Sequence, residues 1–505
     1  MEPAPSVKVA RGATYLFLQG IVANLVIIVF IFFAARLLPT ITDLGVVTTL
    51  SMLSSLFSAF SSLAIPSAIT KYIAEYRGKG CANVAKGVCK IGLKVGIVAA
   101  FLSFFVCFTF ASFLAQFFLG DSSRAYIIML LAVDVFAVVL VDFLGSVLYG
   151  FQDFRRYLLL YLFSAPFRLV VTITLLFKGM AIVGILIGWI VGDYSFLVLV
   201  GYRIYSLSMK TISSDFALKP LTDYSIPLYG SAILNYLAST IDRYLVLGLA
   251  GPSVLGIYSP AATAAGTLSI VSGSLNAALF PQLASMYGRH GKEMLRDVSK
   301  AACRYVGLIY LPLAFGLAVT AFPTIALFVG ERYTPGAHAL ALIALASAFT
   351  CFGAVFSSIL LSVGETRIFF ISGCVAIIVD GLLCVLFVGS LGSTGAAIAR
   401  AFLILVSFIV PALRLRSVMG LNIDFKAYLN SLISSSVMAG VVLSAEVLLA
   451  NKYALPLYIL LGGAVYIIML RFLRVLNQND MTILGQFLPF KIGTCRFLAR
   501  ILISK

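Results

Sequence analysis

Charged residues are scarce in this sequence of 505 residues. Asp, Glu, Lys and Arg make up 11% of it, while 61% of the residues are apolar and the mean hydropathy is +1.08. A water-soluble domain typically carries about 25% charged residues. The composition therefore excludes a water-soluble globule, a disordered chain and a fibrous protein, and it indicates a polytopic membrane protein.

Metal and redox motifs are also missing. The eight cysteines lie singly, with no CxxC pair, and the two histidines, His290 and His338, are far apart in the sequence. We therefore expect no metal site and no cofactor. No segment between the apolar runs is long enough for a soluble catalytic domain, so we do not expect an enzyme.

Long apolar runs take the place of these features. They are continuous over about 20 residues or more, which predicts transmembrane helices and excludes the alternating strands of about 10 residues that form a barrel. The first run is too long for a signal peptide, and we expect it to be retained. Fourteen runs are expected to span the bilayer, at 12–37, 45–70, 90–116, 125–149, 157–177, 181–202, 225–249, 255–286, 303–328, 337–362, 367–388, 393–413, 427–449 and 454–475.

The distribution of basic residues predicts the orientation. With both termini in the cytoplasm, 28 of the 36 Lys and Arg residues fall on the cytoplasmic side, 5 fall on the other side and 3 lie within spans. This bias is typical of a multi-pass protein of the cell membrane. The net charge of +17 is explained by basic loops that face anionic lipid, so we expect membrane lipids as partners and no nucleic acid.

The sequence contains an internal repeat, because a shift of about 212 residues superimposes the first six expected helices on the next six. Leu44-Gly45 falls on Leu255-Gly256. Since six is even, both copies enter the membrane from the same side. This predicts an all-α fold of two six-helix lobes related by a parallel pseudo-two-fold axis, plus two extra helices, with a binding site between the lobes.

The repeat also predicts the domain boundaries. We expect an N-terminal lobe at 1–210, a linker at 211–222, a C-terminal lobe at 223–415, the two extra helices at 416–476 and an amphipathic cytoplasmic tail at 477–505.

Small polar residues recur on one face of the second and eighth helices at spacings of 3, 4 and 7. One interpretation is tight helix packing through small residues. The other is the wall of a water-filled cavity, formed by Ser51, Ser55, Ser58, Ser62, Thr263, Thr267 and Ser274. Asn24 and Asn235 lie within the first and seventh helices and are candidates for the same cavity or for helix contacts.

Ionisable residues inside spans are costly and are therefore candidates for function. Arg168, Arg243 and Arg400 are candidates for holding a phosphate group, because a guanidinium donates two parallel hydrogen bonds to it. Asp134, Asp142 and Asp193 are candidates for a coupling site that binds H⁺ or Na⁺. The alternative is structural pairing, of Arg168 with one of these acids and of Asp380 with Arg400.

Several segments resemble the oligosaccharide flippases of the polysaccharide-biosynthesis family, in the multidrug/oligosaccharidyl-lipid/polysaccharide exporter superfamily. They include Arg36, Asp43, Asp242 and Arg243, whose roles the resemblance leaves open. The segments are Ala35–Leu38, Asp43–Gly45, Ile65–Arg77, Ser239–Tyr244, Gly251–Pro252, Gly256–Ser259 and Gly395–Ala399.

The resemblance implies a transporter that flips a polyprenyl-phosphate- or pyrophosphate-linked oligosaccharide to the outer leaflet by alternating access. It implies a lipid-linked glycan as substrate, glycosyltransferases of the same pathway as candidate partners, and a monomer. The main alternative is a cation-coupled multidrug or toxin exporter of the same superfamily. A membrane-bound glycosyltransferase or polymerase is a further alternative, but it normally needs a long extramembrane loop with clustered carboxylates.

Overall fold

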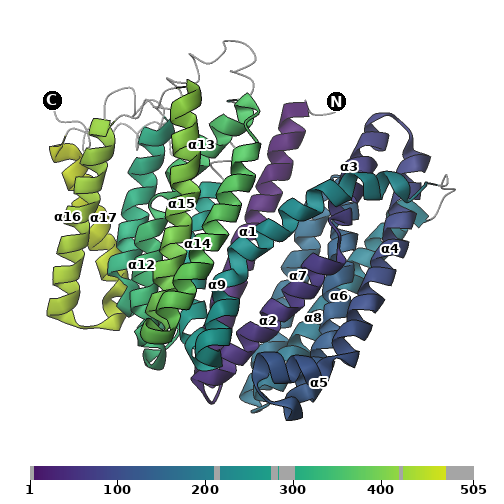
Figure 1. Cartoon of the computed structure of the whole chain (residues 1–505), viewed down its shortest axis with the longest axis horizontal. Coiled ribbons are helices and arrows are strands. Elements are labelled where there is room, and N and C mark those ends of the chain that lie inside the picture. The colour runs from purple at the N-terminus through teal and green to yellow at the C-terminus, as the bar shows by residue number, and fades with distance from the viewer. Residues whose placement is uncertain (1–4, 210–215, 274–282, 284–301, 420–424, 474–505) are drawn as a thin grey trace. The chain divides into compact units, whose positions relative to one another are not determined.

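The structure is a computed structural model that describes residues 5–209, 216–273, 283, 302–419 and 425–473, and every regular element in these ranges is a helix (Figure 1). Within these ranges, twelve helices are long and apolar enough to cross a membrane, or 13 when one bent pair counts as a span. The protein is therefore an all-helical, multi-pass membrane protein, as expected. The tail at 477–505, part of the linker at 211–215, and Ser274 lie outside the described residues.

The chain forms two compact units, Met1–Ser259 and Pro260–Lys505. In the first unit, α6 packs against α2, α3, α4 and α8, and α7 packs against α1 and α8. The elements of this unit are α1 (Pro5–Leu37), α2 (Ile41–Ser61), α3 (Ile65–Gly78), α4 (Ala82–Thr109), α5 (Ala111–Leu114), η1 (Ala115–Leu119), η2 (Ser122–Arg124), α6 (Ala125–Gly150), α7 (Phe154–Phe177), α8 (Ala181–Ile204), η3 (Tyr205–Met209) and most of α9 (Lys219–Gly266).

The start and end of α2 follow from local chemistry. At its start, Thr40 Oγ1 accepts a hydrogen bond from the Asp43 amide at 3.1 Å, and Asp43 Oδ2 accepts one from the Thr40 amide at 3.0 Å, which is a capping box. At its end, Leu63 and Ala64 have positive φ angles of 47° and 56°. The expected helix 45–70 is therefore wrong at its C-terminal end, because the chain breaks here and α3 begins at Ile65.

Helix α9 is too long for one straight span. The apolar helix from Lys219 to Gly273 has 55 residues, which at about 1.5 Å per residue exceeds twice the ~30 Å thickness of a bilayer core. Gly251 interrupts it with a φ of 78° and a ψ of 177°, a conformation that is non-helical and available mainly to glycine. The helix therefore changes direction where Gly251 precedes Pro252.

In the second unit, α15 packs against α12, α13 and α14, and α16 packs against α17. The last two helices share an apolar core with the helix Ala302–Val319, where the Tyr466 hydroxyl donates to Leu308 O at 2.7 Å. The elements after that helix are α11 (Ala321–Phe328), η4 (Glu331–Gly336), α12 (Ala337–Ser347), α13 (Thr350–Val363), α14 (Arg367–Leu391), α15 (Ser393–Met419), α16 (Phe425–Leu449), η5 (Lys452–Ala454) and α17 (Leu455–Phe472).

Candidate functional site

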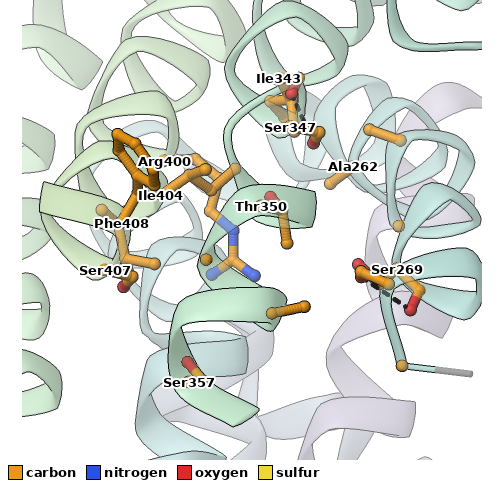
Figure 2. A pocket seen from close by; sticks show the side chains of 17 residues that line it. Ala262, Ser269, Ile343, Ser347, Thr350, Ser357, Arg400, Ile404, Ser407 and Phe408 are labelled. Carbon is orange, nitrogen blue, oxygen red and sulfur yellow. Dashed lines mark hydrogen bonds between the residues drawn. The ribbon is translucent and has the colours of Figure 1, made fainter. Parts of the chain in front are cut away.

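The second unit has an open cavity of about 420 Å³, lined by the end of α9, the helical residues 268–273, α12, α13 and α15. Small and hydroxyl-bearing residues form most of its wall, and Arg400 is the one charged residue among the described residues that line it. Figure 2 shows the Arg400 guanidinium pointing into the space between Thr350 and Ser357. Further lining residues include Ala262, Ala265, Gly266, Ser269, Ser272, Ser347, Ser407 and Phe408.

Hydroxyl groups around this cavity differ in how they are bonded. Ser272 and Ser347 donate to backbone carbonyls of their own helices, at 3.1 and 2.7 Å. Four other lining hydroxyls have no hydrogen bond to any residue in the described part of the chain, and they come from three helices: Ser269, Thr350, Ser357 and Ser407. Because each hydroxyl can donate and accept, the cavity presents unused polar capacity to a ligand.

One wall of the cavity is aromatic. The Phe408 ring lies 5.4 Å from the ring of Phe349 and 5.6 Å from that of Phe356, measured between centroids. These contacts fix Phe408 beside the hydroxyls, so the cavity combines an apolar face, hydroxyl groups and one guanidinium. An arrangement of this kind suits a ligand that is polar around its edge and carries a negative charge.

The first unit holds an ion pair between α7 and α8. Arg168 Nη1 donates to both carboxylate oxygens of Asp193, at 2.9 and 3.0 Å, and its guanidinium lies 5.2 Å from the Trp189 ring. Arg168 thus pairs with an acid of its own lobe, as the structural alternative predicted. Its charge is compensated before any ligand binds.

Two further carboxylates of this unit face serines of α2. Asp134 is 1% exposed and accepts from the Ser54 hydroxyl at 3.4 Å, whereas its Oδ1 has no hydrogen-bond partner among the described residues. Asp142, eight residues further along α6, accepts a short hydrogen bond from Ser58. Neither forms an ion pair within the described ranges, so three acids share one base in this region, as the sequence indicated.

The serines of α2 occupy different environments. Ser51 and Ser55 are exposed, as is Asp142, although all three lie in the middle of apolar helices. Ser62 donates to Ala59 O at the end of α2. Ser54 and Ser58 contact the carboxylates, and the cavity interpretation of Ser51 and Ser55 stays a prediction.

Residues Asp242 and Arg243 of α9 have separate roles. Asp242 is 1% exposed and accepts from the Tyr258 hydroxyl at 2.5 Å and from the Arg243 amide at 2.9 Å. The bond from Tyr258 joins the two sides of the break at Gly251. The Nε of Arg243 is buried and has no hydrogen-bond partner in the ranges that the structure describes.

A row of tyrosines joins α9 to α2. Tyr229 donates to Phe60 O at 3.2 Å, and the hydroxyls of Tyr236 and Tyr244 lie 3.2 and 3.0 Å from Met52 O and 2.7 Å from each other. The spacings of 7 and 8 residues place the three rings on one face of α9. This row was not predicted from the sequence, although the spacing of 7 and 8 residues between its tyrosines can be seen there.

Gly45 and Gly256 occupy equivalent positions in the repeat, and each contacts the segment that contains the other. A Cβ built on Gly45 would lie 1.7 Å from Pro252 O, and one built on Gly256 would lie 2.3 Å from Ile41 O. Ile41 and Pro252 are themselves equated by the shift of 211 residues. The contact is therefore reciprocal, as at a two-fold axis, and it requires glycine on both sides.

The remaining candidates have local partners. Arg36 donates to Phe32 O at 3.0 Å and Asp43 caps α2. The amides of Asn24 and Asn235 donate to Gly20 O and Ser231 O, one helical turn earlier, at 2.8 and 3.0 Å. Thr263 and Thr267 are not among the residues that line the Arg400 cavity, where α9 contributes Ala262, Ala265 and Gly266 instead.

Comparisons with known proteins place these features in a family. A family model described as polysaccharide biosynthesis protein matches residues 33–338, about three fifths of the chain. The uncharacterized membrane protein MJ1068 of Methanocaldococcus jannaschii is 24% identical over 435 residues, which cover 78% of this chain and 81% of that protein. The probable low-salt glycan biosynthesis flippase Agl15 of Haloferax volcanii is 21% identical over 254 residues, which cover 50% of this chain and 54% of that flippase.

Solved structures share the fold. The lipid II flippase MurJ, in an inward closed conformation, superimposes with a TM-score of 0.65 at 16% identity and covers 90% of this chain and 97% of its own. An inward-facing multidrug resistance MATE family transporter of the MOP superfamily gives a TM-score of 0.66 at 15% identity, with coverages of 78% and 94%. The fold is thus that of the MATE and MurJ transporters.

Proposed function

The chain belongs to the polysaccharide biosynthesis protein family, and from this premise we propose that it flips a polyprenyl-phosphate- or pyrophosphate-linked oligosaccharide from the cytoplasmic to the outer leaflet. It is a multi-pass transporter of the MOP superfamily. Its substrate would serve the synthesis of cell-surface polysaccharide or glycan, and glycosyltransferases of the same pathway would supply it. No covalent bond is made or broken in this reaction.

The proposed architecture has 14 spans. Division of the 55-residue helix at Gly251 supports two spans in place of one, and the bent pair 331–347 and 352–363 supports another. The reciprocal contact of Gly45 and Gly256 supports two lobes of six helices related by a two-fold axis, at 1–210 and 223–415, with α16 and α17 as the two extra helices. The proposed cytoplasmic termini follow from the excess of basic residues on that side.

The observation that carries the proposal is the Arg400 cavity. A guanidinium inside a membrane-spanning unit is costly unless it serves a function or is paired. Here it points into a space lined by hydroxyls, which complements the phosphate and the sugar of a lipid-linked glycan. We assign the phosphate to Arg400 because its guanidinium points into the cavity, whereas Arg168 lies in the first unit and binds Asp193. Arg243 is a second candidate, since its buried Nε is available for a hydrogen bond.

Flipping in proteoliposomes tests this function. A fluorescent lipid-linked oligosaccharide is incorporated in both leaflets, and an impermeant reagent that destroys the outer label reports transfer. We expect Arg400→Gln to reduce transfer at least ~10-fold, the loss expected from one charge-assisted hydrogen bond or more. The matched control is Arg416→Gln, an exposed arginine on the same helix, which should keep the activity of the unmodified protein.

The same assay separates the flippase from its rival. A multidrug exporter of this fold would transport small organic cations and leave the lipid-linked oligosaccharide where it is. Transport of an ethidium-like cation without oligosaccharide transfer would refute the flippase. The positive charge of Arg400 inside the cavity argues against a cationic ligand at that place.

We also propose that the carboxylates of the first unit bind the coupling ion. Asp134 and Asp142 have hydroxyl ligands and no basic partner in the described residues. Asp193 lies beside them but already pairs with Arg168. The isosteric changes Asp134→Asn and Asp142→Asn should abolish the stimulation of transport by a pH or Na⁺ gradient. Full stimulation in both variants would refute the coupling proposal.

A further inference from the structure

We infer that the Arg400 cavity is a subsite for the sugar attached directly to the carrier phosphate, so that the protein selects its substrate by this one ring. The inference rests on the proposed function and names the part of the substrate that the site recognises. Recognition would involve the guanidinium, the four unbonded hydroxyls and the face of Phe408.

The size of the cavity limits what enters it. A cavity of about 420 Å³ has room for one pyranose ring with a phosphate, and it is open on one side. The outer sugars of the glycan would therefore remain outside the cavity, where they contribute little to selection.

The placement of polar groups matches one sugar phosphate. Thr350 and Ser357 lie on α13 on either side of the Arg400 guanidinium, so they flank the position of a bound phosphate (Figure 2). Ser407 lies on α15 about two turns beyond Arg400, and Ser269 lies across the cavity in the helical residues 268–273 that follow α9. Hydroxyls from three helices thus surround the space in which the ring would lie.

An apolar wall completes the site. A pyranose has hydroxyls around its edge and C–H groups on its faces, and an aromatic ring packs against such a face. Phe408 is held by Phe349 and Phe356 and cannot turn away without losing these contacts. Inorganic phosphate would use only the guanidinium and the nearest hydroxyls, so it should bind more weakly than a sugar phosphate.

Binding of soluble probes to the purified full chain in nanodiscs tests the subsite. The probes are N-acetylglucosamine 1-phosphate, glucose 1-phosphate, inorganic phosphate and free glucose, measured by calorimetry or by saturation-transfer NMR for weak binding. We expect one of the sugar phosphates to bind at least ~10-fold more tightly than phosphate or the free sugar. Equal affinity for phosphate and both sugar phosphates would overturn the inference.

Substitutions in α13 provide the second arm. Thr350→Val and Ser357→Ala, made singly, should each weaken binding of the sugar phosphate by ~5-fold, since each removes one hydrogen bond. The control is Ser362→Ala on the same helix, whose hydroxyl donates to Ile359 O at 2.6 Å and does not line the cavity. Unchanged binding in both Thr350→Val and Ser357→Ala would overturn the subsite.

A transport assay distinguishes failure of the proposed subsite from failure of the proposed function on which it rests. With lipid-linked glycans that differ in the first sugar only, the subsite predicts different rates, and with glycans that differ in the last sugar only, it predicts equal rates. A protein that flips all of them equally is a flippase without this subsite. A protein that flips none of them overturns the proposed function itself.

Discussion

Replacing Gly45 by alanine tests the close approach of α2 and α9. The new Cβ would lie 1.7 Å from Pro252 O and 2.6 Å from Pro252 C. Because carbon and carbonyl oxygen ordinarily approach to ~3.3 Å, the two segments would have to separate by about 1.6 Å. Both clashing atoms belong to the backbone, so no side chain can rotate to relieve the contact.

The expected cost is at the upper end of the range for overpacking, about 3 kcal/mol. At ~2–4 °C per kcal/mol, the midpoint of thermal unfolding should fall by about 6 °C or more. A maleimide dye that fluoresces on reaction with exposed thiols measures this midpoint, because Cys89, Cys107, Cys303 and Cys384 are buried in the folded chain.

Two further substitutions make the test specific. Gly256→Ala should act like Gly45→Ala, since its Cβ would lie 2.3 Å from Ile41 O. Gly248→Ala in α9 meets no atom within 4 Å and should leave the midpoint unchanged or raise it slightly, given the higher helix propensity of alanine. Equal midpoints for the Gly45, Gly256 and Gly248 variants would refute the reciprocal contact.

Three other changes have expected outcomes in the same thermal assay. Arg168→Gln should destabilise the first unit by about 2 kcal/mol, because it leaves the Asp193 carboxylate without its partner. Adding Asp193→Asn should recover most of this loss. A double variant that is no more stable than Arg168→Gln would contradict the pairing. Thr40→Val removes one half of the capping box and should cost about 1 kcal/mol, seen also as faster hydrogen exchange in the first turn of α2. Tyr236→Phe should lower the free energy of unfolding by about 1 kcal/mol, because it removes the hydroxyl that contacts Met52 O. A stability equal to that of the unmodified protein would argue against the tyrosine row.

Hydropathy predicted the helices of this fold because lipid forces every backbone polar group to bond within its own segment. The end of α2 was harder to predict. Its break at Leu63 and Ala64 contains neither glycine nor proline, and the signal, Pro66, comes only after the break, in the first turn of α3. Hydropathy continues through such a break, so it does not locate it.

The candidate site was partly predictable for a similar reason. Arg168, Arg400, Asp134 and Asp142 stand out in apolar runs because ionised groups are costly there. The hydroxyls around Arg400 do not stand out, since serine is equally common at helix contacts. Only the arrangement of α9, α12, α13 and α15 shows which of them face a common space.

Equivalent positions of the two repeats carry different chemistry, and this difference agrees with the proposed binding of a cation in one unit and of a phosphate in the other. Arg168 of the first unit, paired with Asp193, corresponds to the buried Asp380 of the second. The described interior of the first unit has more acids than bases, which suits a cation, whereas the described wall of the second unit's cavity has one arginine and no acid, which suits an anion. In the proposed mechanism, the first unit would bind the coupling cation and the second would hold the phosphate. Asp134→Arg should therefore abolish transport without weakening the binding of a sugar phosphate to the second unit.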